Sequence, residues 1–300
     1  MERKEIGGTG TSIPEIGIGT WNLSGDIRAE IRSIRKGIRM GMDLIDTAEM
    51  YGTEYLVGKA ISGTDAFIAT KVSPHNLRYD DVINACNASL ARLKAKHIDL
   101  YQVHWPNRAI PISDTMRAME RLVKDGKIRY IGVSNFSAQQ VEEAQDALSR
   151  ERIVSNQVEY SMLVRDIESG LMQYCRKQKI TIIAYSPLAR GRIFKEKYRG
   201  LADVLKVLAD KYSKTVSQVV LNWVISKPNV VAIPKASSIE HMTENAGAAG
   251  WRMSSLDTRM LNQTLEIFSE KPLAMGIAGP LLRSPSFWSL YGRMKRQAKI

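Results

Sequence analysis

Short apolar segments alternate along the chain with stretches of helical length, and this alternation limits the possible folds more than any other feature. Eight segments have the composition of buried strands, at residues 15–18, 43–46, 66–71, 98–104, 128–134, 153–159, 180–186 and 230–234. The stretches between them carry helical periodicity, as where Ile27, Ile31, Ile34 and Ile38 share one face of residues 26–40. Eight alternating units predict a closed (β/α)8 barrel, the TIM-barrel fold.

Local patterns place three helix starts and one hairpin. Three pairs have the spacing of a capping box, in which two side chains satisfy free N–H groups of a helix start: Ser137–Gln140, Thr215–Gln218 and Ser237–Glu240. Residues 3–13 contain a Gly-rich turn and are expected to form a β-hairpin that plugs the bottom of the barrel. The first strand is followed by GIGTW, not by the GxGxxG turn of a doubly wound dinucleotide-binding sheet.

Composition and charge describe an ordinary globular chain with a basic end. No linker or repeat divides the sequence, so we expect a single domain over residues 1–300. The net charge is +12, but the tail at 271–300 supplies six lysines and arginines with no acidic residue, and its structure cannot be assigned from the sequence. The remaining body is mildly basic, which suits a phosphate-bearing cofactor and gives little support for a nucleic-acid or membrane partner.

Targeting and metal-binding patterns are missing from the sequence. The N-terminal segment has no apolar signal region and no stretch is long enough to span a bilayer, so we expect a cytoplasmic protein. Cys86 and Cys175 are isolated and are expected to be buried packing residues. The four histidines show no metal-ligand spacing, and we expect no metal.

Polar residues that could carry chemistry follow three consecutive strands. In a (β/α)8 barrel the active site lies at the C-terminal ends of the strands, which would bring together Asp46, Tyr51, Lys71 and His104. A nearby lysine would lower the pKa of a tyrosine and make it a better acid, while a carboxylate would keep that lysine charged. The histidine could donate a hydrogen bond to a carbonyl oxygen as negative charge develops there. Each residue alone also has an ordinary structural role.

Three longer segments together make the chain resemble the aldo-keto reductase family. They are GMDLIDTAEMYGTEYLVGKAI at 41–61, MERLVKDGKIRYIGVSNF at 119–136 and IPKASSIEHMTEN at 233–245. ATK at 69–71 and VHWP at 103–106 resemble the segments that hold the family's catalytic lysine and histidine. The resemblance reaches to about residue 250 and implies catalytic roles for Asp46, Tyr51, Lys71 and His104.

The same resemblance implies a nicotinamide cofactor bound without a Rossmann fold. Ser134, Asn135 and Gln157 match residues that hold the carboxamide, and Tyr185 matches the aromatic residue that stacks on the nicotinamide ring. The wider implied cofactor site adds Gly19, Thr20, Ser186, Lys235, His241, Glu244 and Asn245, of which the last two match residues that hold the adenine. Trp21 and Trp105 correspond to substrate-pocket positions, although two ordinary core tryptophans are the alternative.

The expected activity is reduction of small aldehydes and ketones by NADPH, with NADH as an alternative cofactor. At the 2′-phosphate site the family often has Lys-Ser and an arginine, whereas this chain has Lys235, Ala236 and His241. A helix N-terminus beside Lys235 should nevertheless favour the extra phosphate. The competing interpretation is a regulatory subunit that binds nicotinamide cofactor without turnover and acts through protein partners.

Overall fold

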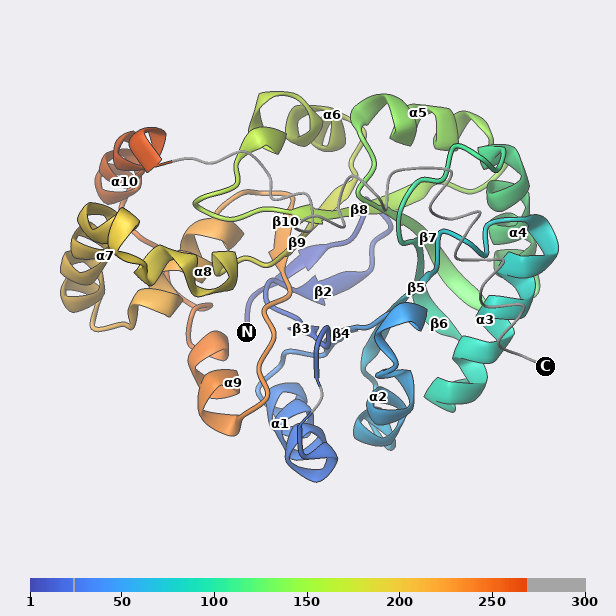
Figure 1. Ribbon diagram of the computed structural model, residues 1–300, viewed down its shortest axis with the longest axis horizontal. Coiled ribbons are helices and arrows are strands. Elements are labelled where there is room, and N and C mark those ends of the chain that lie inside the picture. Colours follow the sequence, from blue (N-terminus) through green and yellow to red (C-terminus); the bar gives the residue numbers. More distant parts are fainter. Residues whose placement is uncertain (24, 269–300) are drawn as a thin grey trace.

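A curled sheet of eight parallel strands forms the centre of the protein, in a computed structural model that describes residues 1–23 and 25–268 (Figure 1). Neighbours in the sheet follow the order of the chain: β3 (Ile18–Gly19), β4 (Leu44–Asp46), β5 (Phe67–Val72), β6 (Ile98–Val103), β7 (Ile128–Ser134), β8 (Ile153–Glu159), β9 (Thr181–Tyr185) and β10 (Val230–Ala232). All eight expected strands are present, and the (β/α)8 prediction is confirmed.

The two outer strands of this sheet meet and close it into a barrel. Parallel bridges join Ile16 to Ala232 and Gly19 to Lys235. The N–H of Gly17 donates to Ala232 O at 2.8 Å, and the N–H of Gly19 donates to Pro234 O at 3.1 Å. A Cβ at Gly19 would lie 2.6 Å from Ile233 O, so only glycine permits this approach. The first strand, β3 at Ile18–Gly19, is shorter than the expected 15–18 and begins at the last of those residues, with Ile16 making only an isolated bridge.

Helices surround the barrel as the periodicity predicts (Figure 1). Their bounds are α1 (Ile27–Arg39), α2 (Glu54–Ile61), α3 (Tyr79–Leu93), α4 (Ile112–Lys124), α5 (Ala138–Asp146), α6 (Leu171–Lys177), α7 (Arg199–Tyr212), α8 (Val216–Ile225), α9 (Ile239–Ala246) and α10 (Ser255–Phe268). Short 3-10 segments are η1 (Glu49–Tyr51), η2 (Asp166–Ser169), η3 (Ala189–Phe194) and η4 (Glu196–Tyr198).

Two of the three expected capping boxes are confirmed and the third is wrong. Ser137 caps α5 and Thr215 caps α8, each with its glutamine partner three residues on. At α9 the cap is Ser238, whose hydroxyl accepts from the N–H of His241 at 3.2 Å. Two adjacent serines occur there, and the helix begins one residue later than the Ser237–Glu240 spacing indicated.

The N-terminal hairpin closes the lower end of the barrel, as expected. Strands β1 (Arg3–Glu5) and β2 (Ser12–Pro14) pair antiparallel. Ile6 and Ile13 of this hairpin are buried in one apolar cluster with residues of the barrel strands. Lys4 fixes the hairpin from outside, because its ammonium donates to Lys227 O and Val230 O, both at 2.8 Å. Burial lowers the pKa of Lys4, and nearby Glu15 partly offsets that effect.

The sequence also led to expectations about the two cysteines, the basic tail, membrane spans and metal ligands. Cys86 and Cys175 are buried as predicted, and burial raises the pKa of each thiol to about 12. The basic tail at 271–300 lies outside the described residues. Within residues 1–23 and 25–268, no helix is both long and apolar enough to cross a bilayer. That part of the chain also holds no cluster of three or more metal-ligating side chains.

Candidate active site

The site arises where the inward-facing residues of the strands change from apolar to polar. Side chains two positions apart on a strand point to the same side. Leu44, Ala69 and Leu100 belong to the apolar cluster inside the barrel. Two residues further along their strands are Asp46, Lys71 and Gln102, all buried. Parallel strands end at one face, so these polar groups meet at the C-terminal end of the barrel.

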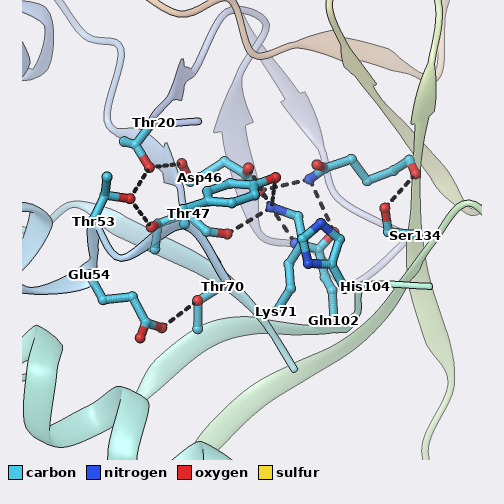
Figure 2. A network of polar contacts seen from close by, with 12 residues as sticks. Thr20, Asp46, Thr47, Thr53, Glu54, Thr70, Lys71, Gln102, His104 and Ser134 are labelled. Atoms are coloured by element: carbon cyan, nitrogen blue, oxygen red, sulfur yellow. Dashed lines mark hydrogen bonds and ion pairs between the residues drawn. The ribbon is translucent and has the colours of Figure 1, made fainter. Parts of the chain in front are cut away.

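Asp46 and Lys71 form a buried ion pair at the centre of this face (Figure 2). Lys71 Nζ donates to Asp46 Oδ1 at 2.6 Å and to Thr47 O at 2.7 Å. The lysine is fully buried and the Asp46 side chain is 3% exposed. Burial lowers the pKa of Lys71, while the adjacent Asp46 carboxylate raises it and so supports the charged form.

Two glutamine side chains fix the second oxygen of Asp46. Gln157 Nε2 donates to Asp46 Oδ2 at 2.7 Å, and Gln102 Nε2 lies 3.4 Å from the same oxygen. The two glutamines also contact each other, because Gln157 Nε2 lies 3.4 Å from Gln102 Oε1. The sequence reasoning missed Gln102. Its position two residues after the inward-facing Leu100 could have revealed it.

Tyr51 reaches the ion pair from the 3-10 turn η1, which follows β4. Its hydroxyl lies 3.5 Å from Lys71 Nζ, and the ammonium lies 4.9 Å from the centre of its ring. Burial raises the pKa of Tyr51 well above its usual value, and the Asp46 carboxylate raises it further. The net direction is therefore opposite to the lowering expected from the sequence: the Lys71 ammonium favours the phenolate, but burial and the Asp46 carboxylate outweigh it.

His104 stands against Tyr51 across the site. The two rings meet edge to face, with centroids 5.4 Å apart and planes at 77°. The backbone N–H of His104 donates to Val72 O at 3.1 Å, which ties the end of β6 to β5. Burial lowers the pKa of His104 well below its usual value, and the Lys71 charge lowers it further. The imidazole is consequently neutral near pH 7 and retains one N–H to donate.

Three threonine hydroxyls connect the backbone around Asp46 to α2 (Figure 2). Thr20 Oγ1 donates to Asp46 O at 2.9 Å and lies 3.1 Å from Thr53 Oγ1. Thr53 Oγ1 is also 3.0 Å from Thr47 Oγ1. Thr20 was expected at the cofactor, but the structure places it in this buried network. Thr47 and Thr53 were missed because single threonines near a strand end carry no distinctive pattern.

A cavity of about 320 Å³ opens above these residues at the C-terminal end of the barrel. Eleven of the expected site residues line it: Gly19, Trp21, Asp46, Tyr51, His104, Ser134, Asn135, Gln157, Tyr185, Ser186 and Lys235. Further lining comes from residues that the sequence reasoning missed: Asn22, Pro187, Leu188, Arg190, Gly191, Ile233 and Pro234. Arg190 covers the Trp21 ring at 5.2 Å, so two loops meet at the mouth of the cavity.

Hydrogen bonds between protein groups fix the polar wall of this cavity. Ser134 Oγ donates to Gln157 O at 2.9 Å, and Asn135 Nδ2 donates to His104 O at 3.1 Å. Tyr185 donates from its hydroxyl to Asn135 Oδ1 at 2.9 Å, which sets the angle of the tyrosine ring. Asn135 has φ of 64°, in the left-handed region that asparagine adopts more readily than most residues with a side chain.

Six expected residues are not part of the cavity lining: Lys71 and Thr20, which lie in the buried networks described above, and Trp105, His241, Glu244 and Asn245. Trp105 is 3% exposed and buried, which agrees with the core-tryptophan alternative. His241 and Glu244 lie on α9, with His241 Nδ1 3.5 Å from Glu244 Oε2. Asn245 is buried on the same helix, and its Nδ2 has no hydrogen-bond partner among the described residues.

Comparisons with known proteins agree with this geometry. The sequence matches the model of the Aldo/keto reductase family over residues 15–266. It is 38% identical to methylglyoxal reductase YeaE of Escherichia coli over 273 residues, covering 88% of this chain and 95% of the relative. It is 35% identical to a glyoxal reductase of Bacillus subtilis over 254 residues, covering 83% and 87% of the two chains.

Solved structures give the same result. A thermostable aldo-keto reductase, Tm1743, crystallised with the inhibitor epalrestat, superposes with a TM-score of 0.83 and 41% identity, covering 88% of this chain and all of that one. An aldo/keto reductase of Klebsiella pneumoniae crystallised with NADP and acetate has a TM-score of 0.80 and 35% identity, covering 90% and 96%. The sequence match, the barrel and the arrangement of its site agree, and the chain belongs to the aldo/keto reductase family.

Proposed function

We propose that this protein is an NADPH-dependent carbonyl reductase in which Tyr51 is the proton donor. The observation that carries the proposal is the buried contact chain from Asp46 through Lys71 to the Tyr51 hydroxyl, at 2.6 and 3.5 Å. A nicotinamide cofactor, when bound, would supply the hydride, from its C4 to the carbonyl carbon. The Tyr51 O–H supplies the proton to the carbonyl oxygen, which gives the alcohol.

The cavity wall fits a nicotinamide. Gln157 uses its amide nitrogen on Asp46, and its Oε1 accepts no hydrogen bond from the described residues, so this oxygen can accept from a carboxamide N–H. Tyr185 offers an aromatic face to a flat ring. Lys235 lines the cavity and has no acidic partner among the described residues, which suits a phosphate. These residues would hold the cofactor against Tyr51.

The pKa shifts suit the proposed chemistry. Tyr51 keeps its proton because burial and Asp46 raise its pKa, so it begins the reaction as a neutral donor. The buried Lys71 ammonium then stabilises the phenolate as it forms, since this charge already stands 3.5 Å away. Neutral His104 donates a hydrogen bond to the carbonyl oxygen and orients it toward Tyr51.

Small carbonyl compounds are the substrates we propose, with 1,2-dicarbonyls such as methylglyoxal and glyoxal first among them. Two relatives carry these substrates in their names. The cavity of about 320 Å³ has room for a small substrate beside Tyr51 and Trp21. We expect NADPH to be preferred because Lys235 adds a positive charge beside the start of α9.

Loss of reduced-cofactor absorbance tests the proposal directly. The purified protein is mixed with NADPH or NADH and with methylglyoxal, glyoxal and a panel of simple aldehydes and ketones. We expect turnover with at least one 1,2-dicarbonyl and a higher kcat/KM with NADPH. Tight NADPH binding without turnover of any carbonyl would instead support the regulatory-subunit interpretation.

A further inference from the structure

The 3-10 turn that carries Tyr51 is too short to fix its own position. The segment η1 has three residues, and the backbone N–H of Tyr51 donates to Ala48 O at 3.0 Å. Gly52 follows with φ of 70°, and Met50 is 43% exposed. A single 3-10 turn of this kind has poor hydrogen-bond geometry. Contacts from outside the turn must therefore set where the Tyr51 hydroxyl lies.

Glu49 provides such a contact. Its Oε1 accepts from Asn76 Nδ2 at 2.6 Å, and its Oε2 accepts from the backbone N–H of Ser73 at 3.0 Å. Ser73 begins the loop that follows β5, two residues after Lys71. The carboxylate therefore joins the turn of Tyr51 to the strand of Lys71. Hydrogen bonds to a charged acceptor are stronger than neutral ones, so this junction is stiff.

The loop at 73–77 is itself fixed on its other side. The N–H of Asn76 donates to Ser73 O at 2.9 Å within the loop. Asn107 Nδ2 donates to Pro74 O at 2.7 Å, and Asn107 belongs to the loop that follows His104. Thr115 Oγ1 donates to Leu77 O at 2.7 Å. Glu49 thus connects the tyrosine turn to a rigid loop that also meets the segment beyond His104.

We propose that Glu49, with its partner Asn76, is a positioning residue that sets the distance from Tyr51 to Lys71 and His104. This inference rests on the proposed function. Glu49 acts through geometry and not through its charge, because both carboxylate oxygens are engaged by donors of the 73–77 loop. The charged group that shifts the pKa of Tyr51 is Asp46. Loss of Glu49 should accordingly lower the rate without moving the pH profile.

The test uses the full-length variants Glu49→Gln, Glu49→Ala and Asn76→Ala. A displacement of about 1 Å at a reacting group can cost about 100-fold in rate, so we expect kcat to fall about 10- to 100-fold in Glu49→Ala. Glu49→Gln keeps one acceptor oxygen and should recover part of that loss. The dissociation constant of NADPH, measured by protein fluorescence, should stay within about twofold of wild type, and the shape of the kcat–pH profile should be unchanged.

Glu120 is a matched control at the opposite end of the barrel. Its carboxylate accepts from the backbone N–H groups of Ser149, Arg150 and Glu151 at 2.8, 2.7 and 3.1 Å. It is the same kind of junction between a helix and a loop, but it adjoins the start of β8. Glu120→Ala should lower the melting temperature at least as much as Glu49→Ala and leave kcat unchanged.

The double variant Glu49→Ala with Asn76→Ala completes the test. If the two act as one unit, its kcat should equal that of Glu49→Ala and not the product of the two single effects. A Glu49→Ala protein that folds and keeps kcat within twofold of an active wild type would overturn the proposal. A wild-type protein without turnover in the same assay would instead overturn the proposed function.

Discussion

Replacing Lys71 with methionine tests the buried ion pair at the centre of the site. Methionine keeps most of the length of the lysine stem but removes the ammonium, its 2.6 Å contact with Asp46 Oδ1 and its 2.7 Å contact with Thr47 O. Asp46 would then hold a buried negative charge supported by Gln157 at 2.7 Å and Gln102 at 3.4 Å. Removing one partner of a buried pair costs about 3–5 kcal/mol of unfolding free energy.

The assay is chemical and thermal unfolding at pH 7. For a chain of 300 residues each kcal/mol corresponds to about 1.5–2 °C, so the melting temperature of Lys71→Met should fall by about 5–10 °C. The double variant Lys71→Met with Asp46→Asn removes both charges and should be more stable than Lys71→Met alone. Arg199→Met is the surface control, because Arg199 pairs with Glu196 at 3.1 Å and the two side chains are 74% and 83% exposed, and it should change little.

Two results would refute this reasoning. One is a Lys71→Met protein as stable as wild type, which would mean that removing the lysine does not leave Asp46 as a buried, unpaired charge. The other is a double variant less stable than Lys71→Met, which would mean that shape and not charge governs the site. In both Lys71→Met and the double variant, the loss of the ammonium should also abolish most reductase activity, because the Tyr51 phenolate would lose its stabilising charge.

Three further predictions concern the pH profile, the cofactor and the hairpin. Burial lowers the pKa of His104 and raises that of Tyr51, so both groups should stay neutral between about pH 6 and 9. The kcat for reduction should therefore be flat over this range. A fall in kcat on acidification, centred near pH 6.5, would show that His104 titrates. Lys235→Ala should raise the dissociation constant of NADPH more than that of NADH, and equal effects would exclude a phosphate contact. Lys4→Met leaves the backbone carbonyls of Ile225, Lys227 and Val230, between the end of α8 and the start of β10, without their donor and should lower the unfolding free energy by about 1–3 kcal/mol, whereas an unchanged denaturation midpoint would show that the hairpin does not need this contact.

The barrel was predictable because its signals are local. Eight apolar segments at regular spacing specify strands, and inward alternation places polar groups such as Asp46 and Lys71 at their C-terminal ends. The hairpin plug and two capping boxes are equally local patterns. The predicted cap of α9 was wrong because Ser237 and Ser238 are adjacent, and the choice between them depends on how the loop from β10 approaches the helix.

The parts of the site that could not be predicted depend on distances between strands. Gln102 and Gln157 are 55 positions apart in sequence, and strand register brings both to the same oxygen of Asp46. The pKa of Tyr51 depends on its burial and on its distance from the Asp46 carboxylate, and the sequence shows neither. Trp105 follows β6 by two residues, and the sequence does not show whether its side chain is buried there or lines the pocket.

The central claim is that Tyr51 donates the proton that completes carbonyl reduction, and Tyr51→Phe tests it most directly. The substitution removes one oxygen and keeps the ring that contacts His104 edge to face. Single-turnover reduction of methylglyoxal, followed alongside the dissociation constant of NADPH, separates chemistry from binding. We expect the dissociation constant to stay within about twofold of wild type while the rate falls by at least about 100-fold. A Tyr51→Phe protein that reduces the carbonyl at the wild-type rate would contradict this claim.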